Sequence, residues 1–261
     1  MLVYHHEEVD STSTRAAELA KEMPGEIILV SADRQTAGRG RMGRAWQSPA
    51  GGAWLSLVWP SAHNAVKMQS SPLVVGLAVG NAIAELVQGE QVGMLDASVV
   101  LKIKWPNDLL LDGRKIAGIL CEQVLNASIG RADSHGCTMI LGVGINANVD
   151  THTLGSDLRQ PPISLAEAIG HPIDLPKLIS LCGKHIVSSM QRLEQNGFAG
   201  EMRAKIQSQL AWLNESVELD VGSKVQTGTF MGIDDQGRLL IEANGVMTPH
   251  TSGEISKLRL A

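Results

Sequence analysis

The sequence contains few cysteines. Cys121, Cys137 and Cys182 lie far apart and form no Cys-x-x-Cys pair. We therefore expect neither a disulfide framework nor a cysteine-rich zinc site, because both require several cysteines at characteristic spacings. The default environment for such a chain is the reduced cytoplasm.

Export signals and long hydrophobic runs are also lacking. The N-terminus has no basic flank followed by an apolar run, so we expect no cleaved signal peptide. The most apolar stretch, residues 72–87, is short and contains Asn81 and Glu85, so it predicts a buried helix and no association with a membrane. Low-complexity tracts and internal repeats are absent.

The chain has no excess of positive charge. Its 22 lysines and arginines are outnumbered by 27 aspartates and glutamates, which gives a net charge of −5. We expect no nucleic-acid partner, because general binding to nucleic acid depends on a basic surface. On this acidic background, a local cluster of arginines favours a small anionic ligand.

That cluster lies in residues 35–46, QTAGRGRMGRAW, directly after the strand-like run 27–32. The segment combines three glycines, three arginines and a tryptophan. Glycines let backbone N–H groups approach an anion closely, and arginines add planar sets of charged donors. The composition is typical of a loop that wraps a phosphate or a carboxylate.

Two other interpretations of this loop stay open. Residues 38–43 fit Gly-x-Gly-x-x-Gly, which predicts NAD binding where the glycines open a helix. Here they lead into a helix-breaking Ser-Pro-Ala-Gly-Gly segment and a predicted strand at 54–59, which argues against a Rossmann turn. The other interpretation is a solvated basic turn.

Polar residues also gather at two other places. Residues 10–14 precede helix formers, so their hydroxyls either cap a helix only or also bind the polar head of a ligand. Asp112-Gly113 separates two apolar runs and predicts a hairpin. Around it lie Lys104, Asn107, Asp108, Arg114 and Lys115, a set suited to binding phosphates and, through Asp108, to positioning Mg²⁺ indirectly. A strand at 137–148 is expected to end in a Gly-x-Gly-x-Asn turn.

Taken in order, these blocks resemble the biotin-protein ligases (biotin-[acetyl-CoA carboxylase] ligases). This family attaches biotin to a lysine of the biotin carboxyl carrier domain of carboxylases such as acetyl-CoA carboxylase. The resemblance rests on Asp-Ser-Thr at 10–12, the loop 35–46, Lys-Trp-Pro-Asn-Asp at 104–108, Arg-Lys-Ile-Ala-Gly-Ile at 114–119, Gly-Val-Gly-Ile-Asn at 142–146 and Gly-Glu-Ile-Ser at 253–256.

The resemblance implies an α+β fold with a mixed-sheet catalytic domain, residues 1–213, followed by a small SH3-like β-barrel, residues 214–261. The sequence supports this division independently. Residues 164–210 have mostly helical spacing of apolar residues, whereas turn signals at 234–237 and 244–245 separate short strand-like runs after Ser216.

The resemblance also implies the chemistry. Biotin reacts with ATP, in the presence of Mg²⁺, to give biotinyl-5′-AMP and diphosphate, and a lysine of the acceptor protein then displaces AMP. Lys115, Arg41 and Arg39 take the catalytic positions. The residues implied to bind biotin and ATP are Ser11, Thr12, Ser13, Gln35, Gly38, Arg39, Gly40, Arg41, Trp46, Lys115, Gly118 and Asn146, and none is implied to ligate a metal.

Alternatives within and outside the family remain. A lipoate-protein ligase runs a similar adenylation, but Trp46 after the loop argues against it. A non-catalytic binding module is disfavoured by Lys115 together with both anion-binding segments. Longer members carry a DNA-binding domain, and because the first matching block begins at Asp10, we expect no repressor role. A homodimer through a sheet edge stays open.

Two positions depart from the family pattern. Ser13 stands where the family commonly has asparagine, so the contact of that asparagine is not carried over. Lys257-Leu258-Arg259 places an extra residue before the arginine, and we assign Arg259 no role.

Overall fold

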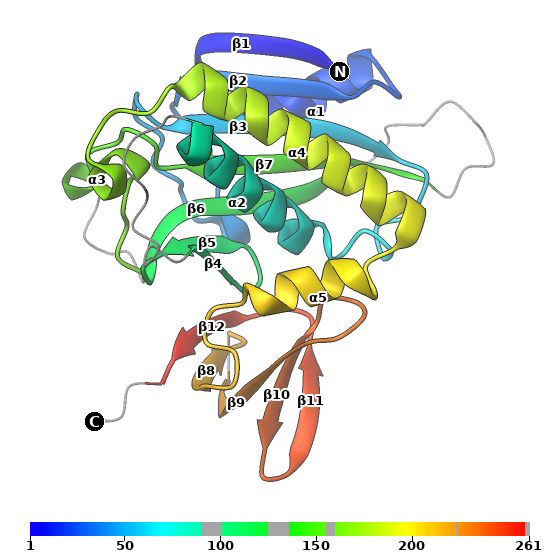
Figure 1. Ribbon diagram of the computed structural model, residues 1–261. Coiled ribbons are helices and arrows are strands. Elements are labelled where there is room, and N and C mark those ends of the chain that lie inside the picture. The colour runs from blue at the N-terminus through cyan, green and yellow to red at the C-terminus, as the bar shows by residue number, and fades with distance from the viewer. Residues whose placement is uncertain (90–100, 125–135, 155–159, 223, 259–261) are drawn as a thin grey trace.

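The computed structural model describes residues 1–89, 101–124, 136–154, 160–222 and 224–258, which form two β-sheets with helices around them (Figure 1). Residues 99 and 100, where the strand before the hairpin was expected to begin, lie outside the described residues, as does Arg259.

The first sheet has seven strands in the order β1-β2-β3-β7-β6-β5-β4. The strands β1 and β2 run parallel, whereas the other neighbours are antiparallel, so the sheet is mixed, as the resemblance implies. The strands are β1 (Leu2–Val9), β2 (Ile28–Gln35), β3 (Ala53–Ser61), β4 (Leu101–Lys104), β5 (Asp108–Leu111), β6 (Arg114–Val124) and β7 (Cys137–Ile145).

The predicted hairpin is confirmed at β5 and β6. Its turn residues Asp112 and Gly113 have φ angles of 48° and 75°, the left-handed conformation that a tight hairpin turn requires. This turn holds Lys115 at the start of β6, where the strand geometry fixes the direction of its side chain.

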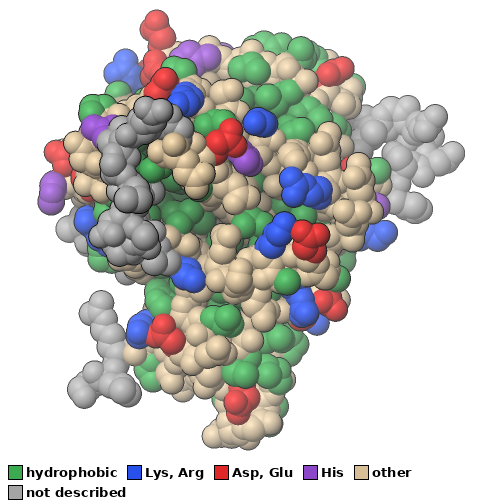
Figure 2. All heavy atoms as spheres, in the orientation of Figure 1, with side chains coloured by type: hydrophobic (Ala, Val, Ile, Leu, Met, Phe, Trp, Pro, Cys, Tyr) green, Lys and Arg blue, Asp and Glu red, His purple; other side chains and the backbone are tan. Residues whose placement is uncertain are grey.

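Helices cover both faces of the first sheet (Figure 1). The helix α1 (Thr12–Glu22) packs on β2, β3 and β7, whereas α2 (Ser71–Gly89) and α4 (Leu175–Asn196) cover the other face. Figure 2 shows the molecule from the side of α2 and α4, and acidic and basic side chains are interspersed on this surface. The remaining helices are α3 (Leu165–Ile169) and α5 (Glu201–Ser208).

The central helix α2 confirms the expected buried helix. Residues 71–88 have the length and mean hydropathy of a membrane span, but 67% of this window is buried inside the protein. Gly80 lets it approach the sheet closely, because a Cβ atom at this position would come within 2.9 Å of Leu101.

The second sheet is antiparallel and has the strand order β11-β10-β9-β8-β12. Its strands are β8 (Ser216–Asp220), β9 (Val225–Ile233), β10 (Leu239–Ala243), β11 (Val246–His250) and β12 (Glu254–Lys257). The predicted β-rich C-terminal segment is therefore present. Among the described residues β11 and β12 are the two edges of an open sheet, and no pairing between them closes a barrel.

A buried tryptophan connects the two sheets. Trp105, between β4 and β5, is 2% exposed, and its indole N–H donates a 3.0 Å hydrogen bond to the carbonyl of Gly237 in the turn between β9 and β10. The backbone of Ile103 also bonds Gln209 and Ala211, just after α5. These contacts fix the second sheet next to the hairpin.

We expect Trp105→Phe to lower the free energy of unfolding by about 1–3 kcal/mol, because the Gly237 carbonyl loses its buried donor. Hydrogen exchange of the β9–β10 turn should accelerate. The control is Trp59→Phe, which removes an indole hydrogen bond to Glu194 at 3.2 Å, away from this turn. Equal exchange rates of the turn in both variants would contradict the assigned connection.

Candidate active site

A cavity of about 620 Å³ opens on the face of the first sheet opposite α2. Its floor is formed by the backbone of β6 and β7 at Gly118, Gly142 and Gly144. Any side chain there would fill the space. A Cβ atom at Gly142 would lie 2.8 Å from the Ser13 hydroxyl, and one at Gly144 would lie 2.7 Å from Trp46 Nε1.

These glycines correct one prediction. Gly142 and Gly144 were expected to form a turn at the end of a strand, but both lie inside β7 and pair with Ser56 and Trp54 of β3. The Gly-x-Gly spacing at 142–144 does not mark a turn. It reflects the close approach of other side chains to the strand, which only glycine permits.

Trp46 lies on this glycine floor. Its ring is within reach of a Cβ atom at either Gly118 or Gly144, and the Lys115 ammonium lies 4.9 Å from its ring centroid, a cation–π contact. The buried indole N–H has no hydrogen-bond partner among the described residues. A bound ligand or water would have to supply the acceptor.

Hydroxyl groups line the end of the cavity formed by α1. Ser11, Thr12 and Ser13 are all buried at the start of this helix. Capping is performed by another residue, because the Gln35 carbonyl oxygen accepts from Thr12 N at 2.7 Å and from the Thr12 hydroxyl at 3.0 Å, while Ser11 forms no side-chain cap. The Ser11 hydroxyl has no hydrogen-bond partner among the described residues.

The arginine-rich loop is an ordered ribbon with a single helical turn, Arg41–Gly43, at its tip. Backbone hydrogen bonds join Gln35 to Ser48, Gly38 to Trp46, and Gly40 to Arg44. The predicted donation of backbone N–H groups to an anion is therefore not available at Gly40, whose N–H bonds the Arg44 carbonyl at 2.8 Å. The arginine side chains provide the donors.

Each loop arginine has a partner from a different part of the chain. Arg39 forms a 2.9 Å ion pair with Glu122 of β6, and Arg44 forms an ion pair with Glu254 of β12. Arg41 donates to the Asn107 side chain at 3.1 Å and to the Gly253 carbonyl at 3.5 Å. The loop thus connects the hairpin to the second sheet.

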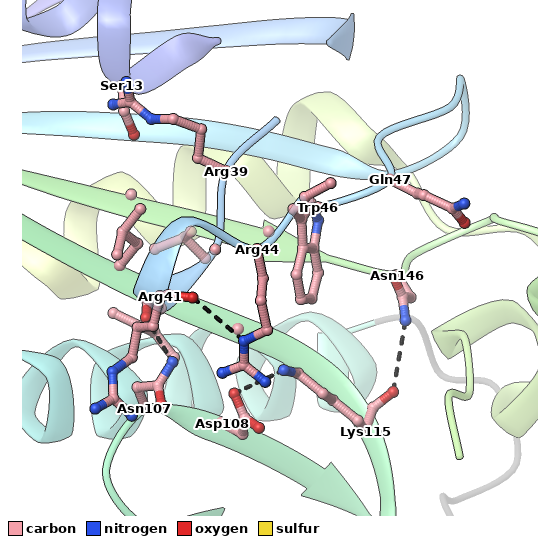
Figure 3. Close-up of a pocket in the computed structure, with 18 of the residues that line it drawn as sticks. Ser13, Arg39, Arg41, Arg44, Trp46, Gln47, Asn107, Asp108, Lys115 and Asn146 are labelled. Carbon is pink, nitrogen blue, oxygen red and sulfur yellow. Dashed lines mark hydrogen bonds and ion pairs between the residues drawn. The ribbon is translucent and has the colours of Figure 1, made fainter. Parts of the chain in front are cut away.

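The hairpin supplies further charged groups that the loop side chains approach in Figure 3. Lys115 Nζ lies 2.8 Å from Asp108 Oδ1, and both groups line the cavity together with Lys104 and Asn107. Arg114 instead donates to the Pro162 carbonyl at 2.6 Å and does not line the cavity. The predicted cluster is therefore confirmed without Arg114.

Burial changes the affinity of two of these cations for protons. Loss of solvating water lowers the pKa of Arg41 and of Lys104, although Asp108 opposes the effect at both positions. A partly desolvated cation attracts an anion more strongly than a fully solvated one does. This end of the cavity is therefore suited to a phosphate or a carboxylate.

Asn146 contacts the backbone of Lys115. Its side-chain NH₂ donates to the backbone carbonyls of Ile163, at 3.3 Å, and Lys115, at 3.5 Å. Both N–H groups are thereby used, which leaves the amide oxygen as an acceptor for an amino group of a ligand.

The structure brings almost all the predicted site residues to this cavity. The exception is Gly38, which lies at the base of the loop, where a Cβ atom would come within 2.4 Å of the Trp46 carbonyl. Sequence reasoning named Arg44 only as part of the anion-binding loop, and it assigned no site role to Gly142, Gly144, Leu154, Gln160 or Glu254. The Gly-Glu-Ile-Ser block was the only signal for Glu254.

Comparison with known families and proteins gives consistent matches. Residues 6–145 match the biotin/lipoate A/B protein ligase family, and residues 213–258 match the biotin protein ligase C terminal domain. The chain is 36% identical over 252 residues to the bifunctional ligase/repressor BirA of Bacillus subtilis, a match that covers 93% of this chain and 70% of that protein.

Other relatives match along nearly their whole length. The biotin--[acetyl-CoA-carboxylase] ligase of Paracoccus denitrificans is 32% identical over 233 residues, which cover 89% of this chain and 90% of that protein. Among solved structures, the biotin protein ligase from Aquifex aeolicus in complex with biotin and ATP is 28% identical, with a TM-score of 0.77 and 99% of both chains covered.

The contact between Arg44 and Glu254 predicts a protease sensitivity. We expect Glu254→Gln to raise the rate of trypsin cleavage at Arg41 and Arg44 by roughly two- to fivefold, the range that corresponds to a partly exposed ion pair. Glu215→Gln is the control, because Glu215 pairs with Lys257 in the same sheet and not with the loop. An unchanged rate in Glu254→Gln would show that the ion pair between Arg44 and Glu254 does not hold the loop.

Proposed function

Because the chain belongs to the biotin/lipoate A/B protein ligase family, we propose that its cavity activates biotin with ATP and transfers it to a lysine of an acceptor protein. One observation carries this proposal. The same cavity has buried neutral hydroxyls at one end and the cations Arg41, Arg44 and Lys115 at the other (Figure 3). An acid with a neutral polar head fits that division of charge.

The cations serve the first step, in which two anions must approach each other. A carboxylate oxygen of biotin attacks the α-phosphorus of ATP, a P–O bond forms, and diphosphate leaves. Two unit charges about 4 Å apart repel by roughly 4 kcal/mol at an effective dielectric constant of 20. Lys115, Arg39 and Arg41 offset this repulsion and stabilise the charge that develops on the phosphoryl oxygens.

Lys115 is the central group in this proposal. Lys115 is paired with Asp108 and lies against Trp46, so its position is fixed from two sides. We assign it to the carboxylate and the α-phosphate. The oxygen of Asn146 is assigned to the adenine amino group, and Trp46 to a wall that excludes water from the reactive anhydride.

The second step needs no nucleophile from this chain. The neutral amine of the acceptor lysine attacks the carbonyl carbon of biotinyl-5′-AMP, the bond to the AMP oxygen breaks, and an amide forms as AMP leaves and the amine loses a proton to solvent. The acceptor in this proposal is the biotin carboxyl carrier domain of acetyl-CoA carboxylase, which is supported by the name of the Paracoccus relative. Residues 1–213 are proposed as the catalytic unit and 214–261 as the small C-terminal unit, acting in the cytoplasm.

Magnesium belongs to the proposal through ATP. The described residues contain no group of three or more histidine, cysteine, aspartate or glutamate side chains arranged to hold a metal. Asp108 is the carboxylate beside the cations, and it is already paired with Lys115. Mg²⁺ is commonly held by one or two carboxylates together with substrate phosphates, so we propose that ATP brings it, with Asp108 contributing indirectly. Bound there, it would neutralise phosphate charge.

Lipoate is the competing substrate, because the matched family includes both kinds of ligase. The match of residues 213–258 to a biotin protein ligase domain favours biotin. The hydroxyl end of the cavity supports the same choice, since a urea ring can hydrogen-bond with it whereas a dithiolane ring has no N–H or O–H groups to do so.

Diphosphate release from ATP and Mg²⁺ tests the proposal, with biotin, lipoate or no acid added. We expect release that depends on biotin and that falls at least a hundredfold in Lys115→Ala, as loss of a transition-state charge contact commonly does. Lys184→Ala is the control, since Lys184 is an exposed lysine of α4 that pairs with Glu85. Release that depends on lipoate and not on biotin would make lipoate the substrate. Absence of diphosphate release with either acid would contradict the catalytic proposal.

A further inference from the structure

A row of hydrogen-bonded side chains runs along the wall of the cavity, from Gln35 to Ser13. The Thr12 hydroxyl contacts the Gln35 carbonyl oxygen at 3.0 Å and the Ser56 hydroxyl at 2.8 Å, and Ser56 contacts the Ser13 hydroxyl at 3.0 Å. Ser56 lies in β3, is 0% exposed and does not line the cavity. It is therefore a buried polar group to which the proposed chemistry assigns no role.

The direction of these hydrogen bonds is fixed by the backbone. Thr12 N can only donate, and it bonds the Gln35 side chain at 2.7 Å, so the atom it contacts is the amide oxygen. The other end of that amide donates to the Ser48 hydroxyl at 2.7 Å, which agrees with this orientation. The amide oxygen is an acceptor, and Thr12 must donate its single hydroxyl proton to it.

The remaining directions follow from counting protons. Because Thr12 has used its proton, Ser56 must donate to Thr12, and Ser13 must then donate to Ser56. Each hydroxyl has one proton, so Ser13 has none left for a ligand. Its lone pairs remain, and its hydroxyl has no second partner among the described residues.

Thr12, Gln35 and Ser13 of this row all line the cavity. Beside Ser13, Gly142 leaves open space, because a Cβ atom there would lie 2.8 Å from the Ser13 oxygen. A ligand group that reaches this end of the cavity meets a hydroxyl oxygen that accepts and does not donate.

We propose that Ser56 is a positioning residue that fixes Ser13 as a hydrogen-bond acceptor for an N–H group of the bound acid's ring. The inference rests on the proposed function and specifies how the cavity recognises its substrate. A cyclic urea presents such an N–H group, whereas a ring with only sulfur and carbon does not. A site built to hydrogen-bond a polar group discriminates strongly against analogues that lack it.

The test measures the dissociation constant for biotin by titration calorimetry in Ser56→Ala, Ser13→Ala and the double variant. Without Ser56, the Ser13 proton is free to turn toward the cavity and oppose the ligand N–H. We expect Ser56→Ala to weaken biotin binding by roughly 3- to 10-fold, the range for one lost hydrogen bond. In the Ser13→Ala background, the same change should have almost no further effect, because Ser56 acts through Ser13.

Ser61→Ala is the control for removing a buried hydroxyl from the same strand. We expect it to leave the biotin dissociation constant unchanged. Thr12→Val provides a second way to break the row and keeps the side-chain volume. It removes the acceptor of Ser56, so Ser56 donates to Ser13 instead and the Ser13 proton turns toward the cavity. We expect this variant to weaken biotin binding more than Ser56→Ala does, because Thr12 itself also lines the cavity.

Melting temperatures establish that each variant is folded. Equal losses from Ser56→Ala in the presence and absence of the Ser13 hydroxyl would overturn the inference, as would an unchanged affinity in both Ser56→Ala and Thr12→Val. Wild-type protein that does not bind biotin would instead contradict the proposed function, so the two failures are distinguishable.

Discussion

The cavity depends on the absence of side chains along two neighbouring strands. Gly118 in β6 and Gly144 in β7 are direct partners in the sheet, and Gly142 lies two residues further along the same face of β7. Trp46 and Ser13 occupy the space that these glycines leave. A methyl group at any of the three would displace the indole or the hydroxyl, because sheet backbone cannot move aside without breaking its ladder.

The charges around this floor are held in place by partners within the chain. The cations of the loop and the hairpin hold acidic or amide partners that come from β6, the hairpin itself and the second sheet. Such pairs order long side chains near the position where they are needed, which lowers the entropy lost on binding. Burial also weakens the solvation of Arg41 and Lys104, which favours an anion as their partner at this end of the cavity.

Local chemistry explains why much of this arrangement was predictable from the sequence. The Asp112-Gly113 turn, the glycine-arginine loop and the apolar helix α2 each depend on residues close together in the chain, and all are present. Contacts between distant segments were not predictable in the same way. The pairing of Arg44 with Glu254 joins residues 210 positions apart, and the role of the β7 glycines depends on Trp46 lying across them.

The central claim is that one cavity binds biotin and ATP together and joins the biotin carboxylate to AMP. Mass spectrometry of the protein mixed with biotin, ATP and Mg²⁺, in the absence of any acceptor, tests it most directly. The account predicts biotinyl-5′-AMP bound at about one molecule per active site, since the cavity is built to hold the product of the first step. Recovery of unreacted biotin and ATP, with no adenylate in the protein or in solution, would contradict it.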